Sequence, residues 1–421
     1  MWKLVRAMRR VRVGAVGTGG IFQNAHLPAY PDIWEAQLVA LCDVSEEALR
    51  RAGREMGAIY NERIRRAEEE GDVESTERLR DDLKGVGTYT GVTEMLSKEE
   101  IDLLDICTPT KFHDAVAIGA LNAGVHVMVE KPMARTYLEC LDVVEAVEDS
   151  GKLYQHNENY LYLSTWYNAR KFIESGVIGE VQFMFLAAAH GGMESAAWFW
   201  DPAISGGGSL LDMGVHPITT SWFLSGFERR PTLVKAAEPH GICTRMRTRI
   251  LKGRFQGVVV EDDAHILVRY EDAETGAWST AHIEGSWSHR DSPATVIIGT
   301  DGRMEPVVEE GRDFLKITGP DGGTRRIPLD TAHFASSFKA SFPREIRNMC
   351  NCVVEKVKPI SNEKIGAETT AIVGAAYLSQ KMGKKAVSLD EFKEYALKIR
   401  EREGKRAPDI LLKELLKGIQ R

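Results

Sequence analysis

The first 151 residues alternate short apolar segments with helix-forming segments, and this alternation constrains the fold more than any other feature. The apolar segments are VRVGAVG (11–17), AQLVALCD (36–43), IDLLDICTP (101–109) and GVHVMVEKP (124–132). Helical patterns such as SEEALRRAGREMG and HDAVAIGALNAG lie between them. Nearly continuous apolar strands separated by helices are typical of a parallel sheet covered on both faces. The sequence therefore predicts an α/β fold with a doubly wound parallel sheet over residues 1–151.

The pattern changes after Gly151. Strand-like runs such as EVQFMFLAAAH, DAHILVRY and GAWSTAHIEGSW follow one another closely, with turn residues between them. This spacing indicates a second α/β domain over 152–390, built on a large, mostly antiparallel open sheet. Residues 391–421 show apolar residues at helical spacing, and we expect a helical extension that packs on the body or on a partner subunit.

A charged segment interrupts the first domain at about 58–84. Residues 61–84 hold 15 charged residues in 24, with Gly71 near the middle. Such a density of charge does not suit a buried element, so we expect an inserted helical hairpin that is exposed to solvent on most sides.

Composition excludes several classes of function. The 421-residue chain carries 54 Lys+Arg against 61 Asp+Glu, a formal charge of -7, and no block of basic residues. That balance argues against a nucleic-acid surface and against binding to anionic membranes. No segment approaches eighteen uninterrupted apolar residues, so we expect a cytoplasmic protein without a membrane span. The six cysteines are scattered, and Cys350 and Cys352 lack the spacing of a zinc site, so we expect reduced thiols and no metal.

The first chemical signal is the segment GAVGTGGIF, in which glycines follow a strand and precede a helix. Glycines allow the backbone to approach a pyrophosphate closely, while helix N–H groups point at it. An ordinary tight turn also uses glycines, but the order strand, turn, helix favours a dinucleotide site. Phe22 stands where a third glycine or alanine is usual, so we expect looser helix packing there. The expected contacts are Gly17, Thr18, Gly19, Gly20 and Ile21.

The second signal is Asp43, at the end of the strand AQLVALCD. A carboxylate at this position accepts hydrogen bonds from the adenosine ribose and repels a 2′-phosphate, which favours NAD over NADP. The alternative is a cap for the following helix, a role that Ser45 fills equally well.

The third signal combines Lys131 with the segment SGGGSLLDMGVHPITT. Lys131 and Pro132 follow an apolar strand directly; taken alone, this lysine reads as an ordinary solvated strand end. Asp212 and His216 are four residues apart, a spacing that places both side chains on one helical face, where the carboxylate could orient the imidazole. A capped surface helix with a solvated aspartate and histidine is the alternative.

Taken together, the ordered motifs GAVGTGGI, CDVS, CTPTKFH, EKP, GVIGEV, GGGSLLDMGVH and GTDG resemble the glucose–fructose oxidoreductase / inositol dehydrogenase / MocA (Gfo/Idh/MocA) family over about residues 10–390. The resemblance implies an N-terminal Rossmann domain and a C-terminal α/β domain whose open sheet makes homodimers or homotetramers. It implies that Lys131, Asp212 and His216 are catalytic. It further implies that Glu130, Thr108, Pro109 and His113 line the dinucleotide.

Contacts to the substrate are harder to transfer from the family, because ENYLYL (158–163) replaces a stretch that often carries arginine. Tryptophan faces suit sugar rings, although buried core tryptophans are an equal alternative. The candidate substrate contacts are Asn159, Tyr160, Trp198 and Trp200.

These signals predict an NAD-dependent oxidoreductase acting on a secondary alcohol of a sugar, sugar derivative or cyclitol. In this hypothesis Lys131 stabilises the developing alkoxide, His216 takes the proton and Asp212 holds the imidazole. One alternative is a redox-neutral glycosidase or lyase that oxidises its sugar transiently. Another is a non-catalytic regulator that senses the cofactor, against which the intact Lys131, Asp212 and His216 argue.

Overall fold

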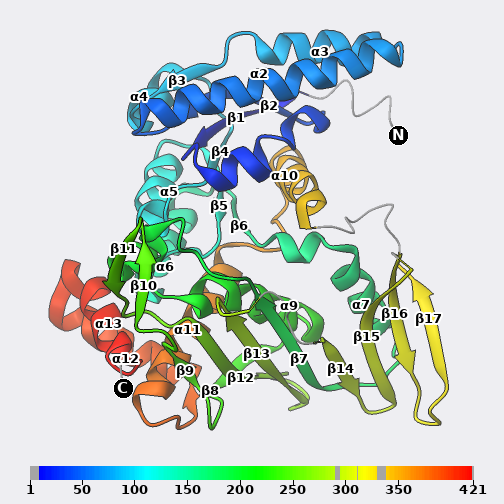
Figure 1. Cartoon of the computed structure of the whole chain (residues 1–421), viewed down its shortest axis with the longest axis vertical. Coiled ribbons are helices and arrows are strands. Elements are labelled where there is room, and N and C mark those ends of the chain that lie inside the picture. Colours follow the sequence, from blue (N-terminus) through cyan, green and yellow to red (C-terminus); the bar gives the residue numbers. More distant parts are fainter. Residues whose placement is uncertain (1–8, 290–293, 311, 330–337, 420–421) are drawn as a thin grey trace. The chain divides into compact units, whose positions relative to one another are not determined.

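The computed structural model describes residues 9–289, 294–310, 312–329 and 338–419 (Figure 1). Contacts divide the chain into two compact units. The first comprises Met1–Glu130, Asp142–Asn157 and Lys339–Glu363, and the second comprises Lys131–Leu141, Glu158–Phe338 and Lys364–Arg421. The units therefore differ from the three consecutive domains expected from the sequence.

The first unit contains a six-stranded sheet in the order β3-β2-β1-β4-β5-β6, in which every neighbouring pair is parallel. This confirms the predicted fold class. Because the order reverses between β1 and β4, the sheet has its switch point there, where such sheets bind ligands. The strands are β1 (Val11–Val16), β2 (Ala36–Cys42), β3 (Gly87–Tyr89), β4 (Leu103–Ile106), β5 (His126–Glu130) and β6 (Tyr154–Asn157).

Helices flank this sheet. The α-helices are α2 (Glu46–Glu69), α3 (Val73–Leu83), α4 (Val92–Lys98), α5 (His113–Asn122) and α10 (Phe338–Glu355), and α6 (Tyr137–Ser150) is divided between the two units. Short helical turns are η1 (Phe22–His26), η2 (Tyr30–Asp32) and η3 (Thr110–Phe112). Helix α10 belongs to this unit because Ile346, Met349 and Cys350 are buried in its core.

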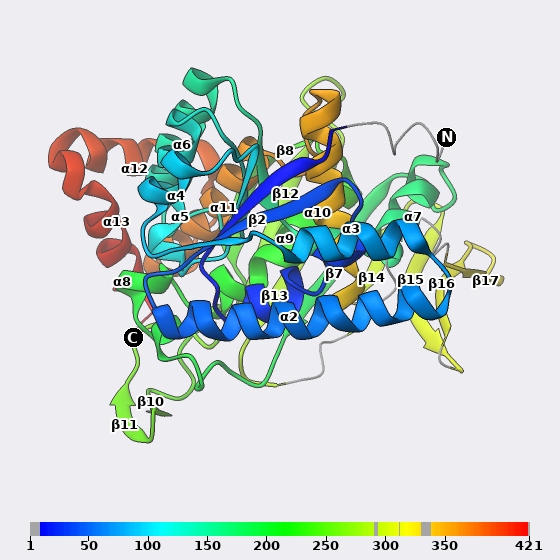
Figure 2. The same cartoon turned by 90° about the horizontal axis from the view of Figure 1, so that it is seen from above.

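The charged segment 58–84 forms the end of α2, a turn, and α3, and the two helices lie side by side (Figures 1 and 2). Gly71 has a φ of 72°, a left-handed conformation that glycine adopts easily, and Asp72 caps α3 by accepting from Ser75 N at 3.0 Å. The hairpin also has a buried side. Ile64 and Leu79 lie in the core of the first unit, so solvent covers only part of it.

The second unit contains a ten-stranded sheet in the order β17-β16-β15-β14-β7-β13-β12-β8-β18, with β9 paired to β12. All its pairs are antiparallel except β7 with β13. The strands are β7 (Val181–Ala189), β8 (Arg230–Ala236), β9 (Ile242–Cys243), β12 (Asp263–Glu271), β13 (Trp278–Ser286), β14 (Val296–Gly299), β15 (Gly302–Glu309), β16 (Arg312–Thr318), β17 (Thr324–Pro328) and β18 (Val387–Ser388). A separate hairpin pairs β10 (Thr248–Leu251) with β11 (Arg254–Gly257).

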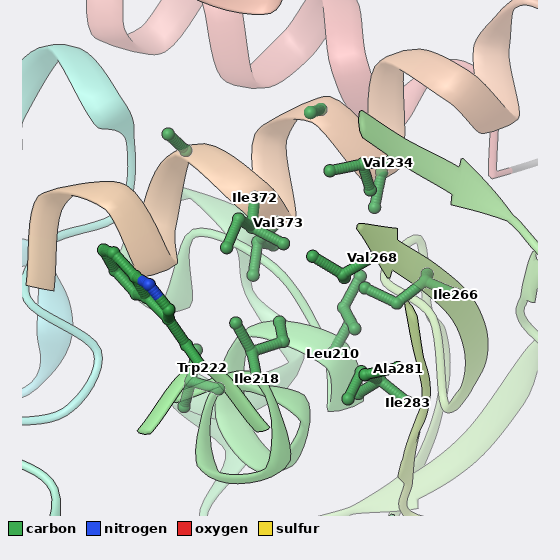
Figure 3. Close-up of a cluster of buried hydrophobic side chains, with 14 of the residues drawn as sticks. Leu210, Ile218, Trp222, Val234, Ile266, Val268, Ala281, Ile283, Ile372 and Val373 are labelled. Atoms are coloured by element: carbon green, nitrogen blue, oxygen red, sulfur yellow. The ribbon is translucent and has the colours of Figure 1, made fainter. Parts of the chain in front are cut away.

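Helices cover one face of this sheet. The α-helices of the second unit are α7 (Ser164–Glu174), α8 (Pro202–Ser205), α9 (Val215–Ser225), α11 (Glu363–Lys381), α12 (Leu389–Glu403) and α13 (Ala407–Leu416), and the short turns are η4 (Asn159–Tyr162), η5 (Ala197–Trp200), η6 (Leu210–Gly214) and η7 (Gly404–Arg406). Figure 3 shows Ile218 and Trp222 of α9, Ile266 and Val268 of β12, and Ile372 of α11 meeting in its core.

The C-terminal extension joins the same core as α9 and α11. Leu411, Leu412 and Leu415 of α13 are buried in this core. The residues of the extension are apolar at helical spacing because one face of the helix packs against the core. Among the described residues, no helix is long and apolar enough to cross a membrane. The six cysteines carry free thiols.

Candidate active site

The glycine turn after β1 lies at the switch point of the parallel sheet. Gly17 has a φ of 86°, and a Cβ there would lie 2.6 Å from the carbonyl carbon of Cys107, so only glycine fits against the end of β4. A Cβ on Gly19 would meet nothing within 4 Å, so there is open space above the turn. Phe22, in place of the third glycine, is fully buried in the core at the start of the π-helical turn η1.

Asp43, which follows β2, accepts hydrogen bonds from the glycine turn. Its Oδ2 accepts from Thr18 N at 2.8 Å and from Thr18 Oγ1 at 3.2 Å, and its Oδ1 accepts from Ser45 N at 2.9 Å. Ser45 Oγ accepts from Ala48 N at the start of α2. Ser45 therefore caps the helix, and Asp43 lies next to the glycine turn.

The segment after β4 completes this edge of the sheet. Thr108 Oγ1 is buried and has no hydrogen-bond partner among the described residues, so it can serve a bound ligand. His113 is buried, and its Nε2 donates to the carbonyl of Thr108 at 2.7 Å, which holds the turn through Pro109. The orphaned hydroxyl and the open space above Gly19 fit a dinucleotide held by Gly17–Ile21, Asp43 and Thr108.

A buried imidazole that the sequence did not single out bridges two carboxylates in the first unit. His26 Nδ1 lies 2.9 Å from Asp105 Oδ2, and its Nε2 lies 2.9 Å from Glu130 Oε1. Burial lowers the pKa of His26, but Asp105 and Cys107 together outweigh burial and hold that pKa well above its usual value. A protonated His26 therefore fixes Glu130, the residue that precedes Lys131. The only sequence signal was its place after the glycine turn.

In the second unit, Lys131 and Asp212 form an ion pair. Lys131 Nζ donates to Asp212 Oδ1 at 2.7 Å and to the carbonyl of Asp212 at 2.8 Å. The other carboxylate oxygen of Asp212 accepts from Trp287 Nε1 at 2.8 Å and lies 3.3 Å from His190 Nε2. Burial by itself raises the pKa of Asp212, but Lys131 and His190 outweigh burial and hold that pKa well below its usual range. Asp212 is therefore a carboxylate, and it orients the ammonium.

The sheet explains how His190 and Trp287 reach one carboxylate. Strands β7 and β13 run parallel and pair Ala189 with Ser286, so the residue after each strand leaves the sheet at the same end. Neither residue was predicted as part of the site, because their positions become equivalent only when these strands pair.

The expected pairing of Asp212 with His216 is wrong. His216 Nδ1 instead donates to Glu158 Oε1 at 2.6 Å, and both side chains are buried. Residues Leu210–Gly214 form the π-helical turn η6, which is wider than an α-helix, so a spacing of four does not bring Asp212 over His216. Because Nδ1 donates, the neutral ring keeps Nε2 as its proton acceptor.

Tyr160 lies against this imidazole. Its ring is parallel to that of His216, with 4.2 Å between centroids and 10° between planes. Burial raises the pKa of Tyr160, and the charges of Glu158 and Asp212 raise it further. The phenol therefore stays protonated and lies within the field of both carboxylates.

The remaining candidates differ in accessibility. Trp200 is buried, lies edge-on to Trp287 with 4.8 Å between ring centroids, and supports the tryptophan that contacts Asp212. Trp198 is half-buried and stacks on Phe199. Asn159 is buried at the start of η4.

Comparison with known proteins assigns the N-terminal and the C-terminal part of the chain to two domains of one family. The sequence model described as an oxidoreductase family with an NAD-binding Rossmann fold matches residues 11–158, and that of the Gfo/Idh/MocA C-terminal domain matches 166–305. The chain is 24% identical to D-glucoside 3-dehydrogenase of Escherichia coli over 218 residues, which are 52% of this chain and 54% of that protein. It is 24% identical to D-apiose dehydrogenase of Paraburkholderia graminis over 378 residues, 88% of each.

Solved structures show the same fold. A levoglucosan dehydrogenase in complex with NADH aligns with a TM-score of 0.73 at 21% identity, covering 90% of this chain and 99% of that one. An aldose-aldose oxidoreductase from Caulobacter crescentus in complex with glycerol aligns with a TM-score of 0.70 at 20% identity, covering 90% of this chain and all of that one.

Proposed function

Because the chain belongs to the Gfo/Idh/MocA oxidoreductase family and uses NAD, we propose that it oxidises a secondary alcohol of a sugar, sugar derivative or cyclitol. The relatives named above act on sugars or glycosides, which supports this class of substrate. The observation that carries the proposal is the ion pair of Lys131 with Asp212, because it holds an ammonium in a defined place.

The chemistry requires charge stabilisation and a proton acceptor. Bound NAD would supply the hydride acceptor for the carbinol carbon. The Lys131 ammonium donates a hydrogen bond to the reacting hydroxyl and stabilises the charge that develops on its oxygen. His216 takes the proton through Nε2, and the Glu158 carboxylate stabilises the imidazolium that results. Asp212 orients Lys131 and does not hold His216.

Cofactor binding in this proposal depends on residues of the first unit. The backbone of Gly17–Ile21 contacts the pyrophosphate, Asp43 the adenosine ribose, and Thr108 Oγ1 a further polar group of the dinucleotide. Tyr160, Asn159 and Trp198 of the second unit are proposed substrate contacts. Glu130 and His113 act by holding the backbone around the dinucleotide, as their contacts with His26 and Thr108 suggest.

The test supplies the purified protein with NAD and a panel of cyclitols, free sugars and glycosides, while NADH absorbance and aglycone release are followed together. Stoichiometric NADH with an oxidised sugar supports the proposal. Aglycone release without lasting NADH would instead show the redox-neutral glycosidase or lyase, and NAD binding without turnover of any substrate would show a regulator.

We also propose that the chain forms a homodimer or homotetramer through the face of the ten-stranded sheet that the helices leave uncovered. Ile298 and Trp278 point away from the helix-packed core and expose 39% and 52% of their surface, and such apolar exposure favours burial against a second copy. Light scattering of the purified protein checks this, and a monomeric mass at micromolar concentration contradicts it.

A further inference from the structure

Three side chains of the second unit that the proposed reaction does not use lie close together. His240, Asp263 and His265 each offer one possible ligand atom, and these atoms lie within 4.8 Å of one another. We call these three residues the histidine cluster. Asp263 and His265 are alternate residues of β12 and therefore point to the same face of the sheet, whereas His240 comes from the loop after β8.

The cluster is compact and lies on the face of the sheet opposite the helix-packed core, since Ala264 and Ile266 occupy the core side of β12. His240 Nε2 lies 2.7 Å from Asp263 Oδ2, and the rings of His240 and His265 are nearly perpendicular with 5.1 Å between centroids. Asp263 is buried, and 42% of the His240 side chain is exposed, so the cluster is open to solvent on the side of the loop. An ion could therefore enter without opening the sheet.

Two neighbours strengthen the arrangement. His282 Nε2, on the adjacent strand β13, lies 3.3 Å from His265 Nδ1 and restricts the rotation of that ring. Cys243 Sγ lies 3.4 Å from His240 Nε2. Two nitrogen ligands of one tetrahedral zinc ion, each about 2.0–2.1 Å from the metal, lie about 3.3 Å apart. The 2.7 Å between His240 Nε2 and Asp263 Oδ2 is shorter, so these two side chains move apart when an ion takes the place of their hydrogen bond.

We propose that the histidine cluster binds a divalent transition-metal ion of the zinc class. Two imidazoles with one carboxylate suit zinc, copper or nickel better than magnesium or calcium, which prefer oxygen ligands. The ion replaces the proton that His240 and Asp263 share, and three protein ligands leave a fourth position for water or for Cys243. The sequence predicted no metal because the cysteines lack the spacing of a zinc site. That argument cannot detect histidine and aspartate ligands that a loop and a strand bring together only in the folded chain.

One neighbouring charge opposes the ion. Arg245 Nε lies 3.9 Å from Asp263 Oδ2, and 42% of its side chain is exposed, so it can move into solvent when the metal binds. A rival group shares Asp263, because Asp263, Glu284 and His289 also offer ligand atoms within 4.8 Å. It has one imidazole and two carboxylates, and we place the ion in the histidine cluster because that set is richer in nitrogen.

The experiment titrates zinc chloride into the full-length protein, prepared without a histidine tag and stripped with a chelator, and follows binding by calorimetry. We expect one zinc ion per chain with a dissociation constant of about 10 μM or lower. His240→Asn combined with His265→Asn should weaken binding at least about a hundredfold, since two of three ligands are lost. Arg245→Ala should tighten it about tenfold, because a positive charge near the ion is removed.

Controls keep the result specific. His126→Asn removes a histidine outside the cluster and should bind zinc like the unmutated protein. Because His265 lies within a strand, His240→Asn alone is the second variant, since its partly exposed side chain can be replaced without disturbing the sheet. Unchanged zinc affinity in both variants, or no binding by the unmutated protein, overturns the proposal. Loss of binding only in His289→Gln would place the ion in the rival group and equally overturn it.

Discussion

The imidazole of His216 donates through Nδ1 to the carboxylate of Glu158, 2.6 Å away, although the two residues are far apart in the sequence. This contact, and not the expected one with Asp212, orients the proposed proton acceptor. The first prediction concerns this pair. Glu158→Gln should lower turnover about ten- to a hundredfold, because the imidazolium loses its counter-charge.

A double-mutant cycle separates the two carboxylates. Adding Glu158→Gln to His216→Ala should cost little further activity, since the carboxylate then has no imidazole to stabilise. Adding Asp212→Asn to His216→Ala should lower turnover further, because Asp212 acts on Lys131. Steady-state kinetics measures both effects. If Asp212→Asn cost no further activity in the His216→Ala background while Glu158→Gln did, Asp212 would be the functional partner of His216.

The second prediction concerns Lys131. Lys131→Met should reduce turnover by several orders of magnitude while NAD still binds, because the glycine turn is unchanged. His216→Ala should lose less, about a hundred- to ten-thousand-fold. Lys84→Met removes a lysine whose side chain is 76% exposed and serves as the matched control. Full activity of the Lys131 variant, with NAD binding measured by fluorescence, would remove this residue from the mechanism.

The third prediction concerns cofactor choice. NAD should bind well ahead of NADP, and Asp43→Ser should narrow the difference because the repulsion of the 2′-phosphate is lost. Because Asp43 also accepts from Thr18 N, the variant should bind NAD itself more weakly. Titration of both dinucleotides checks this, and equal affinity of the unmutated protein for the two would show that Asp43 does not select the cofactor.

The fourth prediction concerns the charged hairpin. Asp82 of α3 is buried and accepts from Arg10 Nη1 at 2.6 Å and from Arg78 Nη1 at 3.2 Å. Asp82→Asn should lower the free energy of unfolding by about 2–3 kcal/mol, because it leaves two arginines without their counter-charge. Asp81→Asn, at an exposed neighbour, should change it by less than about 0.5 kcal/mol. Urea denaturation compares them, and equal stabilities would make the hairpin a purely solvated insertion.

Replacing residues 61–84 with a short Gly-Ser turn is the larger version of this test. NAD affinity of any folded product should stay nearly unchanged, since the glycine turn and Asp43 lie outside the segment. Soluble yield should fall, however, because Ile64 and Leu79 leave the core. A soluble variant as stable as the unmutated protein would contradict the packing described above.

The fifth prediction concerns pH. Glu261 is buried, and burial raises its pKa to about 7 although Tyr377, Leu210 N and Gly208 N donate to its Oε1. A carboxyl whose pKa is higher in the folded state stabilises the fold below its unfolded pKa, and this stability is lost as pH rises through about 7. Glu261→Gln should therefore be more stable than the unmutated protein at pH 8 and lose that advantage at pH 4. Melting temperatures at both values check this, and a difference independent of pH would contradict the raised pKa.

The parallel sheet and the turns at its edge could be predicted from the sequence, because each depends on residues that are consecutive in the chain. The alternation of apolar strands and helices predicted the parallel sheet, because burial on both faces leaves a pattern in consecutive residues. The turns at Gly17 and Lys131 were found for the same reason, since each follows its strand directly. Strand β6 was not expected in the first domain, because it follows Gly151, where the sequence predicted the boundary.

Contacts between distant segments were decided by the tertiary structure alone. His190 and Trp287 meet at Asp212 because two strands happen to be parallel neighbours, and helix α10 joins the first unit through side chains more than 300 residues from β1. Glu158 replaced Asp212 as the partner of His216 because a π-helical turn changed the angle between residues four apart. Local sequence sets the period of an element, but which side chains face one another depends on the packing of elements that no local pattern encodes.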